Sequence, residues 1–392
     1  MAYHAGMDQT QSPFSFSRQP DGFGCELLDS ICRNGGVWHL LAGRILLPRV
    51  LGFCQGVTRA LMMLDQAVTD QARAGRRLVL LGQIIHNPWV NEYFARRGVR
   101  ILEPDELTML ETHVGPADVA VIPAFGISPA IDRRLRDIGC QTVDTTCGDV
   151  RRLWRWAEHA VVEGFGVLIY GRATHDETAV TKSRLAEGGG KYLVVGSLKQ
   201  AKLFAEMVED PAKAKGFSEI FDKQATNAGD IAPFLKLAQV SQTTMLYDET
   251  IRLRKILKDA FGRRFGQDNL SDQSLAFQPT VCRATQDRQS AAVELCSQGC
   301  DLIIVVGGFG SSNTRHLYEL ACSYCPAYFI EDASSLRSDS ELLGFDEQTQ
   351  RAKTFPGWLT KARPATIGLL AGASCPQVVI GQVLQRLADL LA

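Results

Sequence analysis

Short aliphatic runs recur along the chain and alternate with segments whose apolar residues follow a helical spacing. Most runs are followed by a Gly- or Ser-rich turn. Runs of this length predict buried β-strands, and their alternation with helical segments predicts parallel sheets that are covered by helices. The runs that we assign to strands are 78–81, 99–102, 119–122, 167–170, 192–195, 302–306, 327–330 and 366–370.

Two helices have clear boundaries or faces in the sequence. Val57, Leu61 and Leu64 fall on one stripe of a helix that follows Gly56. The segment 129–139 has proline at its start and glycine at its end, which is typical of a helix with a glycine stop.

The recurring pattern divides the chain into an arm and three similar units. The arm, 1–45, is polar and Gly-rich, so we expect it to be loosely ordered. The α/β units that follow are expected at 46–147, 148–281 and 282–392, the last with a C-terminal helix. Within the second unit, a polar segment near 208–232 has the composition of an insertion.

Composition and charge exclude several classes of protein. The 392 residues are 45% hydrophobic and 22% charged, which excludes collagen-like and wholly disordered chains. The formal net charge of −1 leaves no basic excess for binding to nucleic acid or to a membrane surface. No apolar run approaches the roughly 20 residues that span a bilayer, and the N-terminal residues do not resemble a signal peptide. We therefore expect a cytoplasmic protein with no nucleic-acid or membrane partner.

Eleven cysteines are a high count for a cytoplasmic chain, where disulfides are not expected. Most of them fit the ordinary role of a small buried hydrophobe. Cys322 and Cys325 form a C-x-x-C pair at the end of a helical segment, but no second pair lies nearby. The cysteines that we assign to structural roles are Cys25, Cys32, Cys140, Cys296, Cys300, Cys322, Cys325 and Cys375.

Cys54, Cys147 and Cys282 differ because each lies at the start of a predicted helix, with one such cysteine in each unit. A helix N-terminus favours the thiolate, which is the form that binds soft metals. Spacings of 93 and 135 residues exclude a compact ferredoxin or zinc-ribbon motif. Two sites remain open, an iron–sulfur cluster with one open iron and a three-cysteine zinc site, and three buried structural thiols are the alternative.

Eight sequence motifs around these cysteines resemble those of one enzyme family. They cover about residues 44–392 in the same order, and they are GFCQGVTRAL, GQIIHNPWVNEYF, VDTTCGDV, THDET, SQTTMLYDET, VCRATQDRQ, VVGGFGSSNTRHL and AGASCP. The chain is thereby similar to the 4-hydroxy-3-methylbut-2-enyl diphosphate reductases, the IspH or LytB family. It resembles their plant and cyanobacterial type most, because Phe125 stands where the other bacterial type has histidine.

The resemblance implies an oxidoreductase that ends the non-mevalonate isoprenoid pathway. Such an enzyme removes a hydroxyl by two-electron reduction, gives isopentenyl and dimethylallyl diphosphate, and takes electrons from ferredoxin or flavodoxin. By the same resemblance, Cys54, Cys147 and Cys282 hold one 4Fe–4S cluster, around which the three units are arranged. Glu177 is implied as the proton donor and Thr243 as the residue that orders the hydroxyl. The implied diphosphate ligands are His86, His175, Ser311, Ser312, Asn313 and Ser374.

The residues themselves are compatible with these roles. A carboxyl that donates a proton must be protonated when it acts, so we expect an apolar or anionic surrounding to raise the pKa of Glu177. The alternative for Glu177 is a carboxylate that favours a helix start. Ser311–Asn313 follow a strand and a Gly-rich turn, where backbone N–H groups and hydroxyls can bind a diphosphate. The same residue types also serve as ordinary helix caps.

Two positions depart from the commonest family pattern, and two other functions stay open. Phe125 removes one donor from the diphosphate site, and Gly148 replaces the proline that commonly follows the second cysteine. The first alternative function is a cluster-bearing paralogue with another substrate, which the retained Glu177 and serines disfavour. The second is a redox or iron sensor, and the lack of a basic arm or helix-turn-helix disfavours a DNA-binding version.

Overall fold

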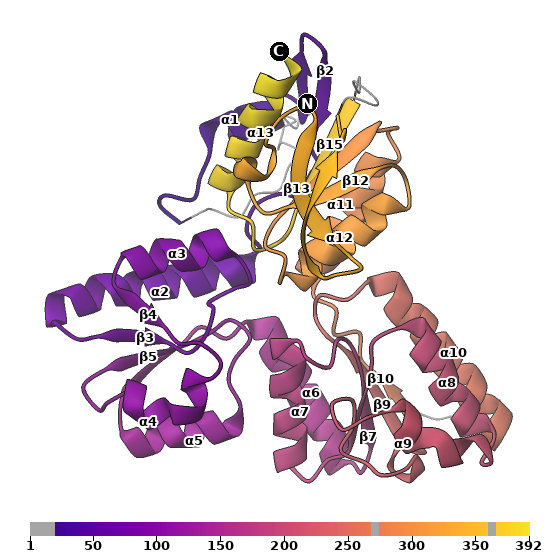
Figure 1. The fold of residues 1–392 in the computed structure, drawn as a ribbon. Coiled ribbons are helices and arrows are strands. Elements are labelled where there is room, and N and C mark those ends of the chain that lie inside the picture. The colour runs from indigo at the N-terminus through magenta and orange to yellow at the C-terminus, as the bar shows by residue number, and fades with distance from the viewer. Residues whose placement is uncertain (1–19, 268–273, 360–365) are drawn as a thin grey trace, which may run out of the picture. The chain divides into compact units, whose positions relative to one another are not determined.

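The computed structural model describes residues 20–267, 274–359 and 366–392, which form parallel sheets covered by helices (Figure 1). Its contacts divide the chain into two compact units. We call Gln55–Gln286 the middle unit, and the described residues up to Cys54 together with those from Asp287 onward the terminal unit. The predicted α/β class is confirmed.

The middle unit contains two four-stranded parallel sheets. The first has the strand order β4-β3-β5-β6, and the second has the order β10-β9-β7-β8. The strands are β3 (Leu78–Leu80), β4 (Val99–Ile101), β5 (Val119–Ile122), β6 (Gln141–Asp144), β7 (Gly166–Tyr170), β8 (Tyr192–Val195), β9 (Leu237–Ser241) and β10 (Leu275–Phe277).

Helices cover both faces of the second sheet, with α6 and α7 on one face and α8 and α10 on the other (Figure 1). This arrangement buries the aliphatic strands, of which β7 is buried along its whole length. The helices of the middle unit are α2 (Gln55–Ala74), α3 (Pro88–Arg96), α4 (Leu110–His113), α5 (Pro129–Ile138), α6 (Gly148–Val162), α7 (Asp176–Glu187), α8 (Leu198–Glu209), α9 (Phe217–Ile220) and α10 (Tyr247–Phe265).

The terminal unit contains one five-stranded sheet in the order β1-β2-β15-β11-β12 and a separate hairpin, β13-β14. Only the β1–β2 pair of the five-stranded sheet is antiparallel. The elements are α1 (Glu26–Arg33), β1 (Val37–Leu40), β2 (Gly43–Leu46), β11 (Leu302–Val306), α12 (Ser312–Cys322), β12 (Ala327–Ile330), β13 (Glu341–Asp346), β14 (Arg351–Pro356), β15 (Thr366–Ala371) and α13 (Gln377–Leu391). Helix α11 (Arg283–Cys296) begins at the end of the middle unit and continues into this unit.

All three sheets share one order of four parallel strands. In each sheet of the middle unit, the fourth strand along the chain lies at the edge beside the third, followed by the first and the second. The terminal unit repeats this order as β2-β15-β11-β12, with β2 in the place of the fourth strand. Equivalent loops therefore follow equivalent strands in the three sheets, and this is where the candidate site residues occur.

The expectation of a loosely ordered arm is wrong for residues 26–45. These residues form α1, β1 and most of β2, and β2 pairs in parallel with β15, with Ile45 opposite Ile367. Ile45 and Leu46 are buried. The sequence pattern missed this strand because only two of its four residues, Ile45 and Leu46, are aliphatic. Residues 1–19 of the expected arm lie outside the described residues.

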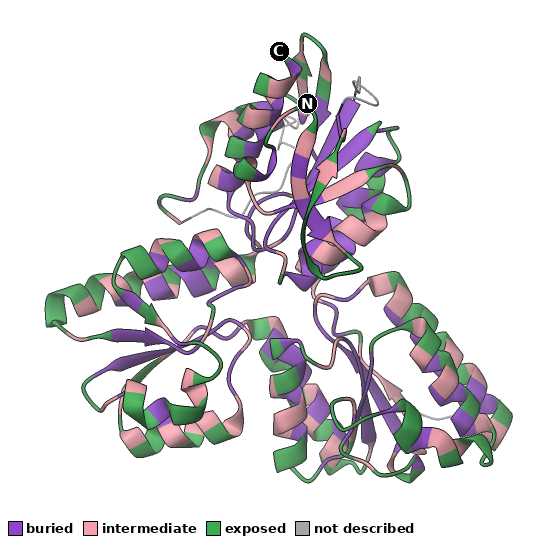
Figure 2. Cartoon of the chain, in the orientation of Figure 1, coloured by how far each residue is buried: buried purple, intermediate pink, exposed green. Residues whose placement is uncertain are grey.

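The polar segment near 208–232 contributes to the core of the middle unit. Phe217 and Phe221 are buried and pack with Phe204 and Phe234 in one aromatic cluster. The expected units 46–147 and 148–281 each contain one four-stranded parallel sheet, whereas the sheet of the expected unit 282–392 also takes up β1 and β2 from residues 37–46. The unit boundaries stay a prediction. Figure 2 shows that buried residues concentrate on the strands. Among the described residues, no helix has the length and apolar character that crossing a bilayer requires.

Candidate functional site

The candidate residues lie in loops after strands or in the first turn of the helices that follow. Cys147 is the N-cap of α6, and Cys54 and Cys282 directly precede α2 and α11. All three cysteines are partly buried. The carboxyl ends of parallel strands are the usual place for ligands in α/β proteins, because helix N-termini and loop residues meet there.

The three cysteines share one backbone contact, which repeats in each sheet. In every case the cysteine N–H donates to the carbonyl of the second residue after a parallel strand. The bonds join Cys54 to Ala373 after β15 (3.2 Å), Cys147 to Ala124 after β5 (3.0 Å), and Cys282 to Thr243 after β9 (3.0 Å). For Cys54 and Cys282, this contact lies on a loop that carries another candidate residue, Ser374 after β15 and Thr243 after β9.

Most of the cysteines that we assigned to structural roles have thiols whose pKa is raised above the ordinary value. Burial raises the pKa of seven of them, so they stay protonated and are poor metal ligands. These seven are Cys32, Cys140, Cys296, Cys300, Cys322, Cys325 and Cys375.

The predicted metal ligands are divided between the two units. Cys54 belongs to the terminal unit, whereas Cys147 and Cys282 belong to the middle unit. Among the described residues, neither unit alone gathers three His, Cys, Asp or Glu side chains that could hold a metal ion. A cluster held by all three cysteines therefore stays a prediction.

Glu177 lies in the first turn of α7 and is only 2% exposed. Its Oε1 accepts a hydrogen bond from the Thr243 backbone N–H, and its Oε2 accepts one from the Thr243 hydroxyl, both at 2.6 Å. Burial raises the pKa of Glu177 to about 7, and the negative charge of Asp149 adds to this, although the bonds from Thr243 act in the opposite direction. The raised pKa that we expected from the sequence is thus present, and its main cause is burial.

His175 is the N-cap of α7, and its Nδ1 accepts a hydrogen bond from the Glu177 backbone N–H at 3.3 Å. A neutral imidazole whose Nδ1 is an acceptor carries its proton on Nε2. His86 lies 5.2 Å from His175 between ring centroids, with the two rings nearly perpendicular. The structure therefore brings the two candidate histidines of the middle unit together.

The two departures from the family pattern have different surroundings. Phe125 stacks on His86 with the ring centroids 4.2 Å apart, so it replaces a polar contact with an aromatic one. Gly148 is the first residue of α6, and a Cβ added there would meet open space. Packing therefore does not require glycine after Cys147.

In the terminal unit, four candidate residues gather at the N-terminus of α12. Ser311 is the N-cap of this helix, and its Oγ accepts from the Thr314 N–H at 3.3 Å. The Ser374 hydroxyl lies 3.4 Å from the same Oγ, and the Asn313 side chain accepts from the Ala373 N–H at 3.0 Å. Ser312, like the others, is buried. Ser311 thus serves as a helix cap, while the group as a whole has the hydroxyls and N–H groups that bind phosphate.

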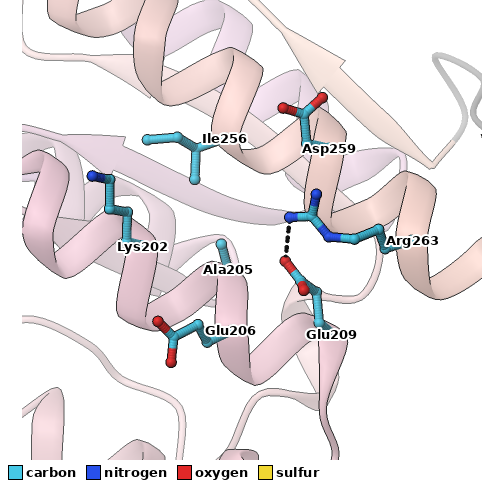
Figure 3. Close-up of a pocket in the computed structure, with 7 residues that line it drawn as sticks. All are labelled: Lys202, Ala205, Glu206, Glu209, Ile256, Asp259 and Arg263. Carbon is cyan, nitrogen blue, oxygen red and sulfur yellow. Dashed lines mark hydrogen bonds and ion pairs between the residues drawn. The ribbon is translucent and has the colours of Figure 1, made fainter.

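A shallow groove of about 340 Å³ lies elsewhere in the middle unit, between α8 and α10 (Figure 3). An ion pair between Arg263 and Glu209 crosses part of it. The groove is lined by Lys202, Ala205, Glu206, Glu209, Ile256, Asp259 and Arg263. No candidate residue from the sequence is among them, so this groove is separate from the predicted site.

Sequence reasoning missed two acidic residues that act on the candidate side chains. Asp149 contributes to the raised pKa of Glu177. Asp176 places its Oδ2 3.6 Å from Nε2 of His86. The sequence shows that Asp149 and Asp176 belong to the VDTTCGDV and THDET motifs. It does not show which side chains they act on, because those side chains come from other loops.

The chain matches the family model described as LytB protein over residues 45–388. A relative from Gloeobacter violaceus, named 4-hydroxy-3-methylbut-2-enyl diphosphate reductase, is 34% identical over 91% of this chain and 84% of its own length. A relative of the same name from Thermosynechococcus vestitus is 32% identical over 92% of this chain and 88% of its own length.

Two solved structures have a similar fold. The structure of a reductase from Plasmodium falciparum aligns with a TM-score of 0.64 at 20% identity, over 87% of this chain and 86% of the other. The structure of (E)-4-hydroxy-3-methyl-but-2-enyl diphosphate reductase, described as the terminal enzyme of the non-mevalonate pathway, aligns with a TM-score of 0.53 at 24% identity. It covers 88% of this chain and 99% of the other.

Proposed function

The chain belongs to the LytB protein family, and we propose that it reduces (E)-4-hydroxy-3-methylbut-2-enyl diphosphate to isopentenyl and dimethylallyl diphosphate. Relatives that it matches over most of their length carry the name of this reductase. The structural observation that carries the proposal is a buried Glu177 whose pKa lies near 7 and whose carboxylate is bound to Thr243.

The reaction breaks the bond between the allylic carbon and the hydroxyl oxygen and forms one C–H bond. It consumes two electrons and two protons and releases water, so the protein must supply a proton source and a route for electrons. No ordinary side chain provides the electrons, which calls for a cofactor.

The donor set formed by Cys54, Cys147 and Cys282 fits a 4Fe–4S cluster. Each of these thiols lies at a helix start, where the thiolate is favoured. When bound, such a cluster supplies electron transfer and Lewis-acid chemistry at an iron without a cysteine ligand. Burial raises the pKa of Cys296, Cys300 and Cys375, which disfavours the thiolate form that a cluster binds at those positions.

Glu177 is suited to deliver the proton that the departing hydroxyl needs. In the carboxylate form, Oε1 accepts from the Thr243 backbone N–H and Oε2 accepts from the Thr243 hydroxyl. When the carboxyl is protonated, its proton is carried on Oε2, and Oε2 then donates to the Thr243 hydroxyl. That hydroxyl can accept a proton from Oε2 and donate its own onward. With a pKa near 7, Glu177 can be both a proton donor and, after release, a stable carboxylate at neutral pH.

The diphosphate is assigned to polar groups at strand ends in both units. In the terminal unit these are Ser311, Ser312, Asn313 and Ser374, which combine hydroxyls with the N-terminus of α12. In the middle unit they are His86 and His175. We include in the proposal a cytoplasmic location and ferredoxin or flavodoxin as the electron donor.

Anaerobic purification followed by iron, sulfide and turnover measurements tests this function. The wild type should contain iron and sulfide and convert the allylic diphosphate with a chemically reduced dye as electron source. Glu177→Gln should retain the cluster and lose turnover, whereas Glu187→Gln, at the exposed end of the same helix, should behave like the wild type. A cluster-loaded wild type that does not release the two products, and does not rescue a strain depleted of the pathway, would favour a paralogue with another substrate.

A further inference from the structure

The imidazole of His86 is enclosed by side chains from other loops of the middle unit. Phe125 stacks on it at 4.2 Å with an interplanar angle of 17°, and His175 meets it edge-on at 5.2 Å. The His86 side chain is only 16% exposed. Because one face of the ring is covered by Phe125, a polar ligand can reach His86 only through its ring nitrogens.

One ring nitrogen of His86 already faces a carboxylate. Oδ2 of Asp176, the first residue of α7, lies 3.6 Å from Nε2 of His86. Phe125, which stacks on the ring, can neither donate nor accept a conventional hydrogen bond. In a neutral His86 with its proton on Nε2, Nδ1 would be an acceptor, which cannot bind a phosphate oxygen. Only the imidazolium has donors on both nitrogens.

We propose that Asp176 is a positioning residue of the diphosphate site, whose carboxylate keeps a proton on Nε2 of His86 so that the ring presents Nδ1–H and positive charge to the diphosphate. This inference rests on the proposed function, in which His86 binds the diphosphate. Asp176 itself does not contact the substrate in this account, and its effect is transmitted through His86.

The charged groups around His86 make its protonation sensitive to Asp176. Burial has the largest influence and leaves the pKa of His86 below its ordinary value. The negative charge of Asp176 acts in the opposite direction, and the positive charge of Arg172 adds to the lowering. His175, the other titratable neighbour, has Nδ1 engaged by the Glu177 N–H, so it can donate from Nε2 while neutral. The two histidines therefore bind a diphosphate differently, and only His86 depends on an acidic partner.

The test compares Asp176→Asn with Asp176→Glu across about pH 6 to pH 8.5, a range that spans the usual histidine pKa. Loss of the carboxylate lowers the pKa of His86, so KM should begin to rise at lower pH than in the wild type. If the loss of the Asp176 carboxylate lowers the pKa of His86 by one unit, KM at a fixed pH above that pKa rises about tenfold while kcat is unchanged. Asp176→Glu should restore KM to within about threefold, and Glu187→Gln on the same helix should change nothing.

A second measurement separates this proposal from the proposed function. Nitrogen NMR of the imidazoles in the ¹⁵N-histidine-labelled holoprotein, with His86→Gln for assignment, follows the titration of His86 with and without inorganic pyrophosphate. Pyrophosphate should raise the pKa of His86 more in the wild type than in Asp176→Asn. Equal titration of His86 in the two proteins overturns the role of Asp176, whatever the substrate. If the wild type fails to convert the allylic diphosphate but the titrations differ, the proposed function fails and the pairing stands.

Discussion

Cysteines lie at both ends of the parallel strands, and their surroundings differ. We call the side of a sheet where its parallel strands end the carboxyl edge, and the side where they begin the amino edge. At the carboxyl edge, Cys54, Cys147 and Cys282 follow strands and precede helices, and each N–H is bound to a neighbouring strand exit. At the amino edge, cysteines precede strands or end helices, and burial raises the pKa of their thiols. The amino-edge cysteines are Cys140 before β6, Cys296 and Cys300 before β11, and Cys322 and Cys325 before β12.

This difference follows from the direction of parallel strands. Helix N-termini, with their unpaired N–H groups, lie at the carboxyl edge, where they favour thiolates, carboxylates and phosphates. At the amino edge, helix C-termini and hydrophobic side chains surround the thiols, as for Cys296 and Cys300 in the core beneath α11 and α12. Position within the fold, more than residue type, separates candidate ligands from packing residues.

The largest expected effect comes from removing a carboxyl-edge cysteine. Cys147→Ser should lose iron and sulfide and at least about 100-fold of the activity, because loss of a ligand exceeds the cost of losing an outer contact. Cys325→Ser at the amino edge should keep both. Iron and sulfide analysis, together with turnover measurements, is carried out on both variants. Equal loss of the cluster in the two variants would remove the distinction between the edges.

Glu177→Gln should lower kcat by about 100- to 10,000-fold, the usual contribution of a general acid, without loss of the cluster. In the wild type the acid must be protonated, and burial places its pKa near 7. The value of kcat should therefore fall as the pH rises through about 7, and the residual rate of the variant should lack this step. A wild-type profile that rises through the same range would show that Glu177 does not act as an acid.

Two glycines with similar backbone conformations, one at each edge, allow the effect of a substitution on stability to be compared. Gly126 after β5 has φ +80°, and a Cβ there would lie 2.2 Å from the Trp154 ring, whereas Gly139 before β6 has φ +74° and open space around it. Gly126→Ala should lower the free energy of unfolding by about 2–5 kcal/mol, the sum of backbone strain and overpacking. Gly139→Ala should lower it by only about 1–2 kcal/mol. Denaturant unfolding measures the free energy of unfolding of both variants. Equal losses of stability would mean that the Trp154 ring can move away from the added Cβ at no cost in free energy.

The smallest effect is expected at the two ends of α12. Ser312→Ala, at the N-terminus, removes a hydroxyl from the diphosphate site and should raise KM about tenfold with kcat nearly unchanged. Ser323→Ala, just past the other end, removes only an exposed hydroxyl that bonds Leu320. Steady-state kinetics distinguish the two, and a fall in kcat at constant KM for Ser312→Ala would contradict a pure binding role.

Much of the fold was predictable because buried parallel strands have a strong local signal. The assigned runs 192–195, 302–306 and 327–330 coincide with β8, β11 and β12. Strands with weaker local patterns were not predicted. Only the second half of β2, Ile45 and Leu46, is aliphatic and buried, and β9 contains two polar side chains, Gln239 and Ser241, that are buried and hydrogen-bonded.

The site residues stay a prediction, and the sequence did not indicate the contacts that several of them make. The motif around Glu177 indicated a carboxyl that needs a raised pKa, and the structure supplies the burial that causes it. The sequence gives no sign that Thr243 binds both oxygens of this carboxylate, or that Asp176 faces His86. These contacts join loops after different strands, so tertiary structure creates them.

In the proposed function, the thiols of Cys54, Cys147 and Cys282 hold one 4Fe–4S cluster and leave one iron to the substrate. Mössbauer spectroscopy of the ⁵⁷Fe-labelled wild type tests it most directly, because it distinguishes iron sites by their ligands. We expect that one iron differs from the other three and that only its signal shifts when the allylic diphosphate is added. Four equivalent irons with spectra unchanged by the substrate would contradict it.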